Sequence, residues 1–177
     1  MPSYLNHKDV KWEYCELTQD GEFSDRVYGM FARLADVRNY RKVPSLPKRG
    51  FPNDVCNNTL YAYCISVMPD KDYESDEDYY SEHRRTKSSY ADEWIRDGCS
   101  VVMGTDYMGN RLISDPDWHT PSWCTTEEMK QCIQDCFYTE EEGWHGDYIE
   151  WFGLLGAMEG YEREGLYECR AVFWFDN

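Results

Sequence analysis

Apolar and polar residues alternate near both ends of the chain. Within 10–17, Val10, Trp12 and Tyr14 alternate with Lys11 and Glu13, and residues 167–175 place apolar side chains at every second position, which is the period of a β-strand with one buried face. In the second segment Cys169, Ala171 and Phe173 share that face, opposite Glu168 and Arg170. The pattern therefore predicts a strand at each end of the chain.

Apolar residues at helical spacing predict helices in the interior. Residues 27–35 carry them three and four positions apart. Thr125 and Glu128 have the spacing of a capping box, in which each side chain bonds the backbone N–H of the other. The helix that follows turns one apolar face to the core: Met129, Cys132, Ile133, Cys136 and Phe137.

A further helix is predicted over 148–158, with Asp147 as its N-cap and Gly160 as its end. Its inward residues are Tyr148, Ile149, Trp151, Phe152, Leu155 and Met158. A shorter helix is expected over 90–96, with Tyr90 and Trp94 on one face and Gly98 after it.

Residues 100–103 and 112–113 are expected to pair as a hairpin around a turn at 108–111. Residues 60–68 fit a strand or a helix, with Pro69 as their end. Strands at both ends with helices between them predict an α+β fold, with a small sheet that includes both terminal strands and packs against several helices. The length of 177 residues is that of a single domain, 1–177.

The segment 69–92 differs in composition from its surroundings. It begins with six closely spaced carboxylates and three tyrosines, and it continues into His83, Arg84, Arg85 and Lys87. We interpret it as a solvated acidic insertion or loop. Its candidate partner-binding residues are Asp70, Asp72, Tyr73, Glu74, Asp76, Glu77, Asp78, Tyr79 and Tyr80.

The whole chain is acidic, with 34 Asp and Glu against 18 Lys and Arg and a formal net charge of −16. That charge opposes direct binding to nucleic acid or to an anionic membrane, whose phosphates would repel it. It favours a basic partner, with simple solubility as the alternative. Residues 1–16 lack the apolar stretch of a signal peptide, and no run has the length of a membrane span.

The eight cysteines are spread along the chain without a CxxC pair. Metal knuckles and redox motifs use such pairs, so neither is indicated. Reduced, mostly buried thiols in a cytoplasmic protein are the simplest expectation.

A stiff, basic loop follows the first predicted helix. Pro44, Pro47 and Pro52 restrict its backbone, and Gly50 permits a close backbone approach. Its cations suggest a phosphate or nucleotide site, for which the candidate residues are Arg38, Lys48, Arg49, Gly50, Asp54 and His119. Two alternatives remain open: the cations pair with the chain's own carboxylates, or Arg38 braces the loop through Asp54.

Four blocks of the sequence occur in a telling order: LADVRN at 34–39, PKRGFPNDV at 47–55, His119 with SWCT at 122–125, and RAVFWFD at 170–176. In this order they resemble a widespread, largely uncharacterised family of phage and prophage proteins. Members often open with Gly-Cys-Asp-Ile-His and carry a His-Ser-His-Ser-Trp run. The present chain lacks that opening, and Thr120 and Pro121 stand where the second histidine would be. The resemblance therefore implies a phage origin more than an enzymatic activity.

Two catalytic readings are weaker. Asp115, Asp117 and His119, joined by His145 and Asp147, could hold a divalent cation, although no two-histidine helical motif is present. The alternative is a polar loop between packed tryptophans. Cys124 stands near His119 and just before a predicted helix, where a thiolate would be favoured, but a small packing residue explains it as well. We therefore predict no metal, no cofactor and no catalytic residue.

The leading hypothesis from the sequence is a non-enzymatic phage accessory protein in the cytoplasm of the bacterial host. It would bind a basic, nucleic-acid-binding defence protein through its acidic surface, as an anti-CRISPR-like inhibitor does. The alternative is a protein that sequesters or hydrolyses a nucleotide-type immune signal. A structural or regulatory phage component is the third possibility.

Overall fold

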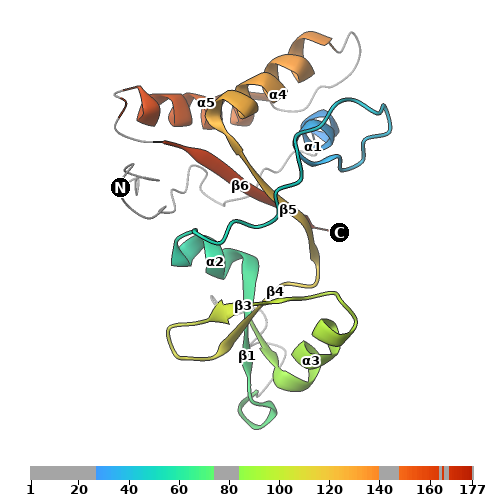
Figure 1. Cartoon of the computed structure of the whole chain (residues 1–177), viewed down its shortest axis with the longest axis vertical. Coiled ribbons are helices and arrows are strands. Elements are labelled where there is room, and N and C mark those ends of the chain that lie inside the picture. Colours follow the sequence, from blue (N-terminus) through green and yellow to red (C-terminus); the bar gives the residue numbers. More distant parts are fainter. Residues whose placement is uncertain (1–26, 74–83, 140–147, 164, 166–167, 177) are drawn as a thin grey trace. The chain divides into compact units, whose positions relative to one another are not determined.

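The computed structural model describes residues 27–73, 84–139, 148–163, 165 and 168–176 (Figure 1). These residues form helices and strands in separate groups, so the predicted α+β class is confirmed. None of the helices in these ranges combines the length and apolar character needed to cross a membrane. The predicted strand at 10–17 lies outside the described residues.

The chain divides into two compact units. Unit 1 comprises residues 1–56 and 120–174, and unit 2 comprises residues 57–119 and 175–177. The expectation of a single domain stays a prediction, because two compact units can still belong to one cooperative fold.

Unit 1 is built from α1 (Tyr28–Ala35), α4 (Thr126–Thr139) and α5 (Tyr148–Glu162), with α4 in contact with both other helices. Strand β5 (Trp118–Thr125) pairs with β6 (Arg170–Asp176), and the boundary between the units falls near one end of each strand. The largest fully buried side chains of this unit are Met30, Leu34, Met129, Ile133 and Met158. The C-terminal strand predicted from the alternating pattern is thus present, paired with β5.

The capping box at the start of α4 forms as predicted. The Thr125 N–H donates to the Glu128 carboxylate at 2.9 Å, and the Glu128 N–H donates to the Thr125 hydroxyl at 3.3 Å. The apolar face of this helix is buried at Met129, Cys132, Ile133 and Cys136.

Two details predicted for α5 are wrong. Phe152 is 46% exposed, because it lies next to Trp151 on the helix and the two side chains diverge by 100°. The helix also continues past Gly160 to Glu162, since a glycine within a helix is tolerated at a modest cost. Trp151, Leu155 and Met158 are buried as expected.

Unit 2 contains a four-stranded sheet in the order β2-β1-β4-β3. The strands are β1 (Cys64–Met68), β2 (Arg85–Lys87), β3 (Val102–Thr105) and β4 (Arg111–Ser114). Helix α2 (Asn57–Tyr63) precedes β1, so residues 60–68, whose pattern fits a strand or a helix, contain the end of a helix and a whole strand. The hairpin β3–β4 and the helix α3 (Ser88–Arg96) confirm two predictions, including the contact between Tyr90 and Trp94.

The two faces of β1 have different surroundings. Ile65 and Val67 pack with Ile113 of β4 and Ala91 of α3 in one buried cluster. Because side chains alternate along a strand, Cys64, Ser66 and Met68 lie on the opposite face of the sheet.

The acidic segment is the connection between two parallel strands. The register pairs Ser66 with Arg85 and Met68 with Lys87, so the chain must run back along β1 before it enters β2. Parallel neighbours need a connection of about a dozen residues or more, which residues 69–84 supply. Residues 85–92 belong to β2 and α3, so the range 69–92 is not one continuous solvated loop.

Candidate functional site

The loop that follows α1 is fixed by local hydrogen bonds. Asn39 donates to the Asp36 carboxylate and to the Val43 carbonyl, both at 2.8 Å, and its own side-chain oxygen accepts from the Val43 N–H at 2.9 Å. Leu46 N–H donates to the Arg33 carbonyl at 2.7 Å, which ties the loop back to α1. Asp36, Arg38 and Lys42 have positive φ angles of 60°, 50° and 53°. These bonds stabilise the conformation of the loop, and the stiffness expected from its prolines stays a prediction.

Arg49 lies at the centre of a polar cluster in unit 1. Its guanidinium donates two hydrogen bonds to the Glu128 carboxylate, at 2.7 and 2.5 Å, and one to the Trp123 carbonyl at 2.9 Å. It also stacks over the Trp123 ring, 4.4 Å from the centroid. The Arg49 backbone N–H donates to the Ser122 hydroxyl at 3.2 Å. Arg49 thus joins the loop to β5 and to the first turn of α4.

This pairing shifts the titration of both charged groups. The hydrogen bonds from Arg49 lower the pKa of Glu128 to about 2, helped by the Thr125 N–H and opposed by partial burial. The same contact with Glu128 raises the pKa of Arg49. Both groups are therefore charged and mutually satisfied across the physiological range.

Asp54 pairs with an arginine far along the sequence. Arg170 Nη2 lies 2.6 Å from Asp54 Oδ1, and the Arg170 guanidinium carbon lies 5.6 Å from the Trp123 ring centroid. Asp54 is therefore braced by Arg170, and the suggestion that Arg38 braces it is wrong. Gly50, at φ +71°, adopts the left-handed conformation that favours glycine, and no atom lies within 4 Å of its missing Cβ.

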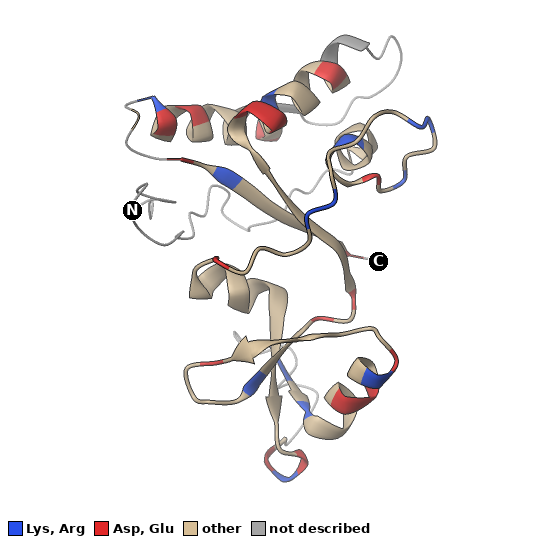
Figure 2. Cartoon of the chain, viewed as in Figure 1, with Lys and Arg blue, Asp and Glu red and all other residues tan. Residues whose placement is uncertain are grey.

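The remaining cations of the candidate ligand site are held elsewhere. Arg38 donates to the Tyr28 hydroxyl at 2.8 Å and lies 5.0 Å from that ring's centroid. Lys48 forms an exposed pair with Asp36 at 3.9 Å. Figure 2 shows the basic positions on this loop in blue. The structure thus brings Arg49 and Asp54 into one cluster through Trp123 and Arg170, while Arg38 and Lys48 have their own contacts.

His119 belongs to unit 2 and contacts the last described residues of the chain. Its ring stacks on Phe175, and its Nε2 lies 3.1 Å from the Asp176 carbonyl oxygen. Asp115 is paired with Arg84. Among the described residues no three His, Cys, Asp or Glu side chains are gathered closely enough to hold a metal ion, and His145 and Asp147 lie outside them.

Cys124 is fully buried, and burial raises the pKa of its thiol. A buried thiol with a raised pKa is the opposite of an activated nucleophile, so these two observations favour the packing interpretation of Cys124. Five of the seven described cysteines are buried, as expected: Cys64, Cys124, Cys132, Cys136 and Cys169. Cys15 lies outside the described residues.

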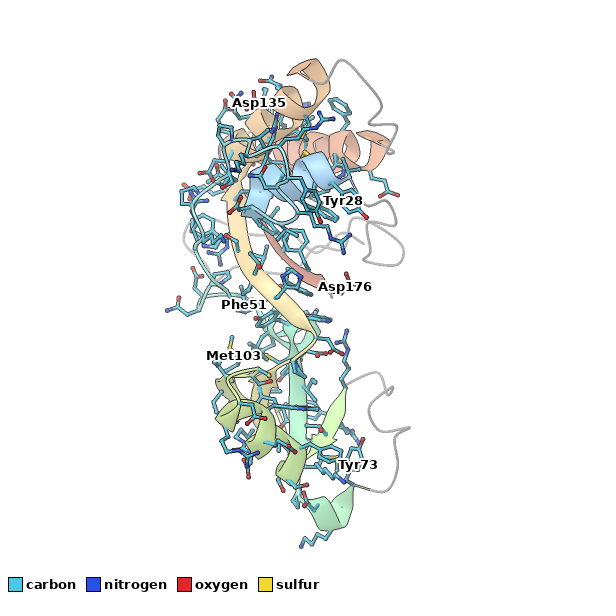
Figure 3. All side chains as sticks on the ribbon, turned by 90° about the vertical axis from the view of Figure 1, so that its right-hand side faces the viewer. Tyr28, Phe51, Tyr73, Met103, Asp135 and Asp176 are labelled. Carbon is cyan, nitrogen blue, oxygen red and sulfur yellow. The ribbon has the colours of Figure 1, made fainter. Side chains whose placement is uncertain are left out.

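At the start of the acidic segment, Asp70 caps a helix. Its Oδ1 accepts hydrogen bonds from the Ser88 hydroxyl and the Ser89 N–H, both at 2.9 Å. These bonds lower the pKa of Asp70. Asp72 is exposed, and Tyr73, labelled in Figure 3, is the last described residue before the gap. Glu74, Asp76, Glu77, Asp78, Tyr79 and Tyr80 lie outside the described residues.

Arg84, at the other end of the segment, forms a second arginine cluster. Its Nη1 pairs with Oδ2 of Asp115, whose side chain is 0% exposed. The guanidinium carbon lies 4.1 Å from the Trp118 ring centroid, and that ring contacts Tyr63. The sequence assigned Asp115 to a metal site and Arg84 to a solvated insertion; the structure pairs them inside unit 2.

A pocket in unit 2 escaped the sequence analysis. Its volume is about 40 Å³, and its walls come from β1, β2, β4 and the β3–β4 turn. Ser66, Arg85 and Leu112 lie in the walls, with Tyr107 and Met108 on the turn. One feature of the sequence could have indicated it. Tyr107 and Met108 are large apolar residues in a turn next to Gly109, where polar residues are usual.

No protein-family model, curated protein or solved structure matches this chain.

Proposed function

We propose that this protein is a phage-encoded accessory protein that acts in the cytoplasm of the infected bacterium by binding a basic host protein. The target class that best fits its charge is a nucleic-acid-binding defence factor, so the role is counter-defence by inhibition. Asp and Glu side chains on its surface would occupy the site that the target uses for phosphates. The resemblance of four sequence blocks to phage proteins supports the origin.

The charge of one connection carries this proposal. Between Asp70 and Glu82 the sequence has seven acidic residues and a single lysine. The strand register makes this stretch the connection between β1 and β2, with its two ends anchored in unit 2. Dense negative charge on such a connection speeds encounter with a basic target and fixes its orientation.

The contacts of the other candidate groups support binding over catalysis. Arg49, Asp54, Asp115 and His119 are engaged in hydrogen bonds within the chain, and Cys124 is buried. A group that already satisfies its charge internally gains little from a ligand. The pocket of about 40 Å³ is also far below the several hundred Å³ typical of nucleotide-sized ligands.

A capture experiment with charge-matched baits tests the proposal. The test variant carries Glu74→Gln, Asp76→Asn, Glu77→Gln and Asp78→Asn, and retains Asp70 because it caps α3. The control carries the same loss of charge at four exposed positions elsewhere, Glu93→Gln, Asp97→Asn, Asp117→Asn and Glu127→Gln. Each bait is incubated with bacterial lysate, and the captured proteins are quantified by mass spectrometry at increasing salt.

The wild-type and control baits should enrich the same basic protein, with capture falling steeply as salt screens charges beyond about 8 Å. The test bait should lose that protein. Equal capture by the test and wild-type baits would overturn the assignment to the acidic connection.

Nucleotide capture remains the second candidate because Arg38 and Lys48 are exposed cations on one proline-rich loop. Its signature is a stoichiometric nucleotide released when the purified protein is denatured. In that case Arg38→Ala and Lys48→Ala would remove the nucleotide, and the four changes in the acidic connection would not.

A further inference from the structure

The pocket of unit 2 lies on the face of the sheet opposite α3. Ser66 and Met68 of β1 line the pocket. The alternate residues of the same strand, Ile65 and Val67, pack on the other face in the cluster with Ala91 of α3. Leu112 of β4, which pairs with Ser66, forms part of its wall. The described pocket thus has an apolar wall on a fixed sheet.

Its rim is an ordered turn with exposed apolar side chains. Tyr107 is 70% exposed and Met108 is 63% exposed. Asp106 holds the turn by accepting hydrogen bonds from the Met108 N–H at 2.9 Å, the Asn110 N–H at 2.8 Å and the Ser66 hydroxyl at 3.1 Å. Large exposed side chains on a fixed turn beside a pocket are typical of binding surfaces, and methionine adapts to varied partners.

The acidic connection begins and ends at this pocket. Met68, the residue before Pro69, lines it, and so do Arg84 and Arg85 at the return of the chain. The described residues that flank the connection on both sides therefore line the pocket. In protein interfaces, a few side chains buried in central pockets carry most of the binding energy. Surrounding charges speed the encounter and fix the orientation.

Charges within the pocket are balanced. Arg84 is paired with the buried Asp115, and the lining holds one further cation, Arg85, and one carboxylate, Asp106. A volume of about 40 Å³ holds roughly three water molecules, close to the space that the end of an aliphatic side chain requires. Size and charge therefore both fit an uncharged apolar group.

We propose that this pocket is the anchor site for one aliphatic side chain of the basic partner, with Tyr107 and Met108 closing around it. This inference rests on the proposed function and specifies the recognised feature: an apolar residue flanked by lysines or arginines. The acidic connection attracts the flanking cations, and the pocket distinguishes among basic segments by their apolar residue.

Two lysine-rich peptides, one with a central leucine and one with glycine in its place, test the pocket directly. Their affinities are measured by fluorescence anisotropy at low salt against the full chain. Burial of the leucine side chain should make the first peptide bind about tenfold more tightly. In the complex with that peptide, the methyl signals of Met68 and Met108 should shift in the NMR spectrum.

Three variants separate the pocket from the charge. Tyr107→Ser with Met108→Ser should abolish the preference for leucine and leave the affinity for the glycine peptide unchanged. A control with Tyr40→Ser and Val101→Ser removes two exposed apolar residues that do not line the pocket, and should keep the preference. The four-residue neutralised variant of the acidic connection should weaken both peptides.

Equal affinity of the two peptides for the wild-type protein would overturn the pocket inference, and so would a leucine preference that persists without Tyr107 and Met108. Undiminished binding of both peptides to the neutralised variant would instead overturn the proposed function. The two failures are therefore distinguishable.

Discussion

Arg49 in unit 1 and Arg84 in unit 2 have closely similar surroundings. Each stacks on a tryptophan, at 4.4 Å from Trp123 and 4.1 Å from Trp118, and each pairs with a carboxylate. The carboxylates differ in burial. The Glu128 side chain retains 27% of its exposure, whereas that of Asp115 has none.

That difference sets what each pair contributes. A carboxylate that water can still reach loses a modest stabilising contact when its arginine is removed, because solvent replaces part of the interaction. A fully buried carboxylate without its arginine is an uncompensated charge, which costs several kcal/mol. A third carboxylate, that of Asp70, is exposed and accepts a hydrogen bond from the first turn of α3. Burial decreases from Asp115 to Glu128 to Asp70. The loss of stability on disrupting each contact should decrease in the same order.

The largest effect is expected for Arg84→Ala. It should lower the free energy of unfolding by about 3 kcal/mol, because the buried Asp115 loses the cation that pairs with it. Urea unfolding monitored by circular dichroism measures the change. Adding Asp115→Asn should recover part of the loss, since the asparagine carries no charge. A double variant no more stable than Arg84→Ala would contradict the buried-charge explanation.

An intermediate, pH-dependent effect is expected for Glu128→Gln. The folded-state pKa of Glu128 is about 2, against 4.5 for an unperturbed glutamate, so its contribution is present above pH 4.5 and is lost as the pH falls toward 2. At neutral pH the variant should be less stable than the wild type by about 2 kcal/mol, after allowance for solvent screening. The difference in unfolding free energy between the two proteins, measured across this range, should shrink at low pH. A difference that is constant with pH would rule out the ion pair as its source.

The smallest effect is expected for Asp70→Asn. Its side chain is exposed, and an asparagine still accepts a hydrogen bond at a helix N-terminus, so the melting temperature should fall only slightly. Asp72→Asn is the matched control, because it removes the same charge two residues away. Because the neutral asparagine accepts the Ser89 N–H less strongly than the carboxylate does, hydrogen exchange at Ser89 should be faster in Asp70→Asn than in Asp72→Asn. Equal exchange at Ser89 in both variants would show that Asp70 does not stabilise the start of α3.

Local signals in the sequence predicted the local structure well. The capping box at Thr125 and Glu128 and the turn around Gly109 depend on neighbouring residues, and both are present, although Arg111, predicted in the turn, already belongs to β4. Prolines and capping side chains act on residues within a few positions, so a short stretch of sequence is enough to predict their effect.

Pairings between distant residues were not predictable in the same way. Asp54 and Arg170 are 116 positions apart, and Arg84 and Asp115 are 31 apart. Many carboxylates in an acidic chain could serve each arginine, and only the fold selects one. The parallel pairing of β1 with β2 likewise turned an apparent insertion into a connection, which composition alone does not reveal.

The central claim is that Arg49, although it stands in a ligand-like loop, is a folding contact between the loop and α4. A double-mutant cycle of Arg49→Ala, Glu128→Ala and the combined variant tests it most directly, with unfolding free energies measured at neutral pH. The two losses should be less than additive, with a coupling of about 1 kcal/mol for this partly exposed pair. Losses that add within about 0.3 kcal/mol would show that the two side chains do not stabilise each other, and would return Arg49 to the candidate ligand site.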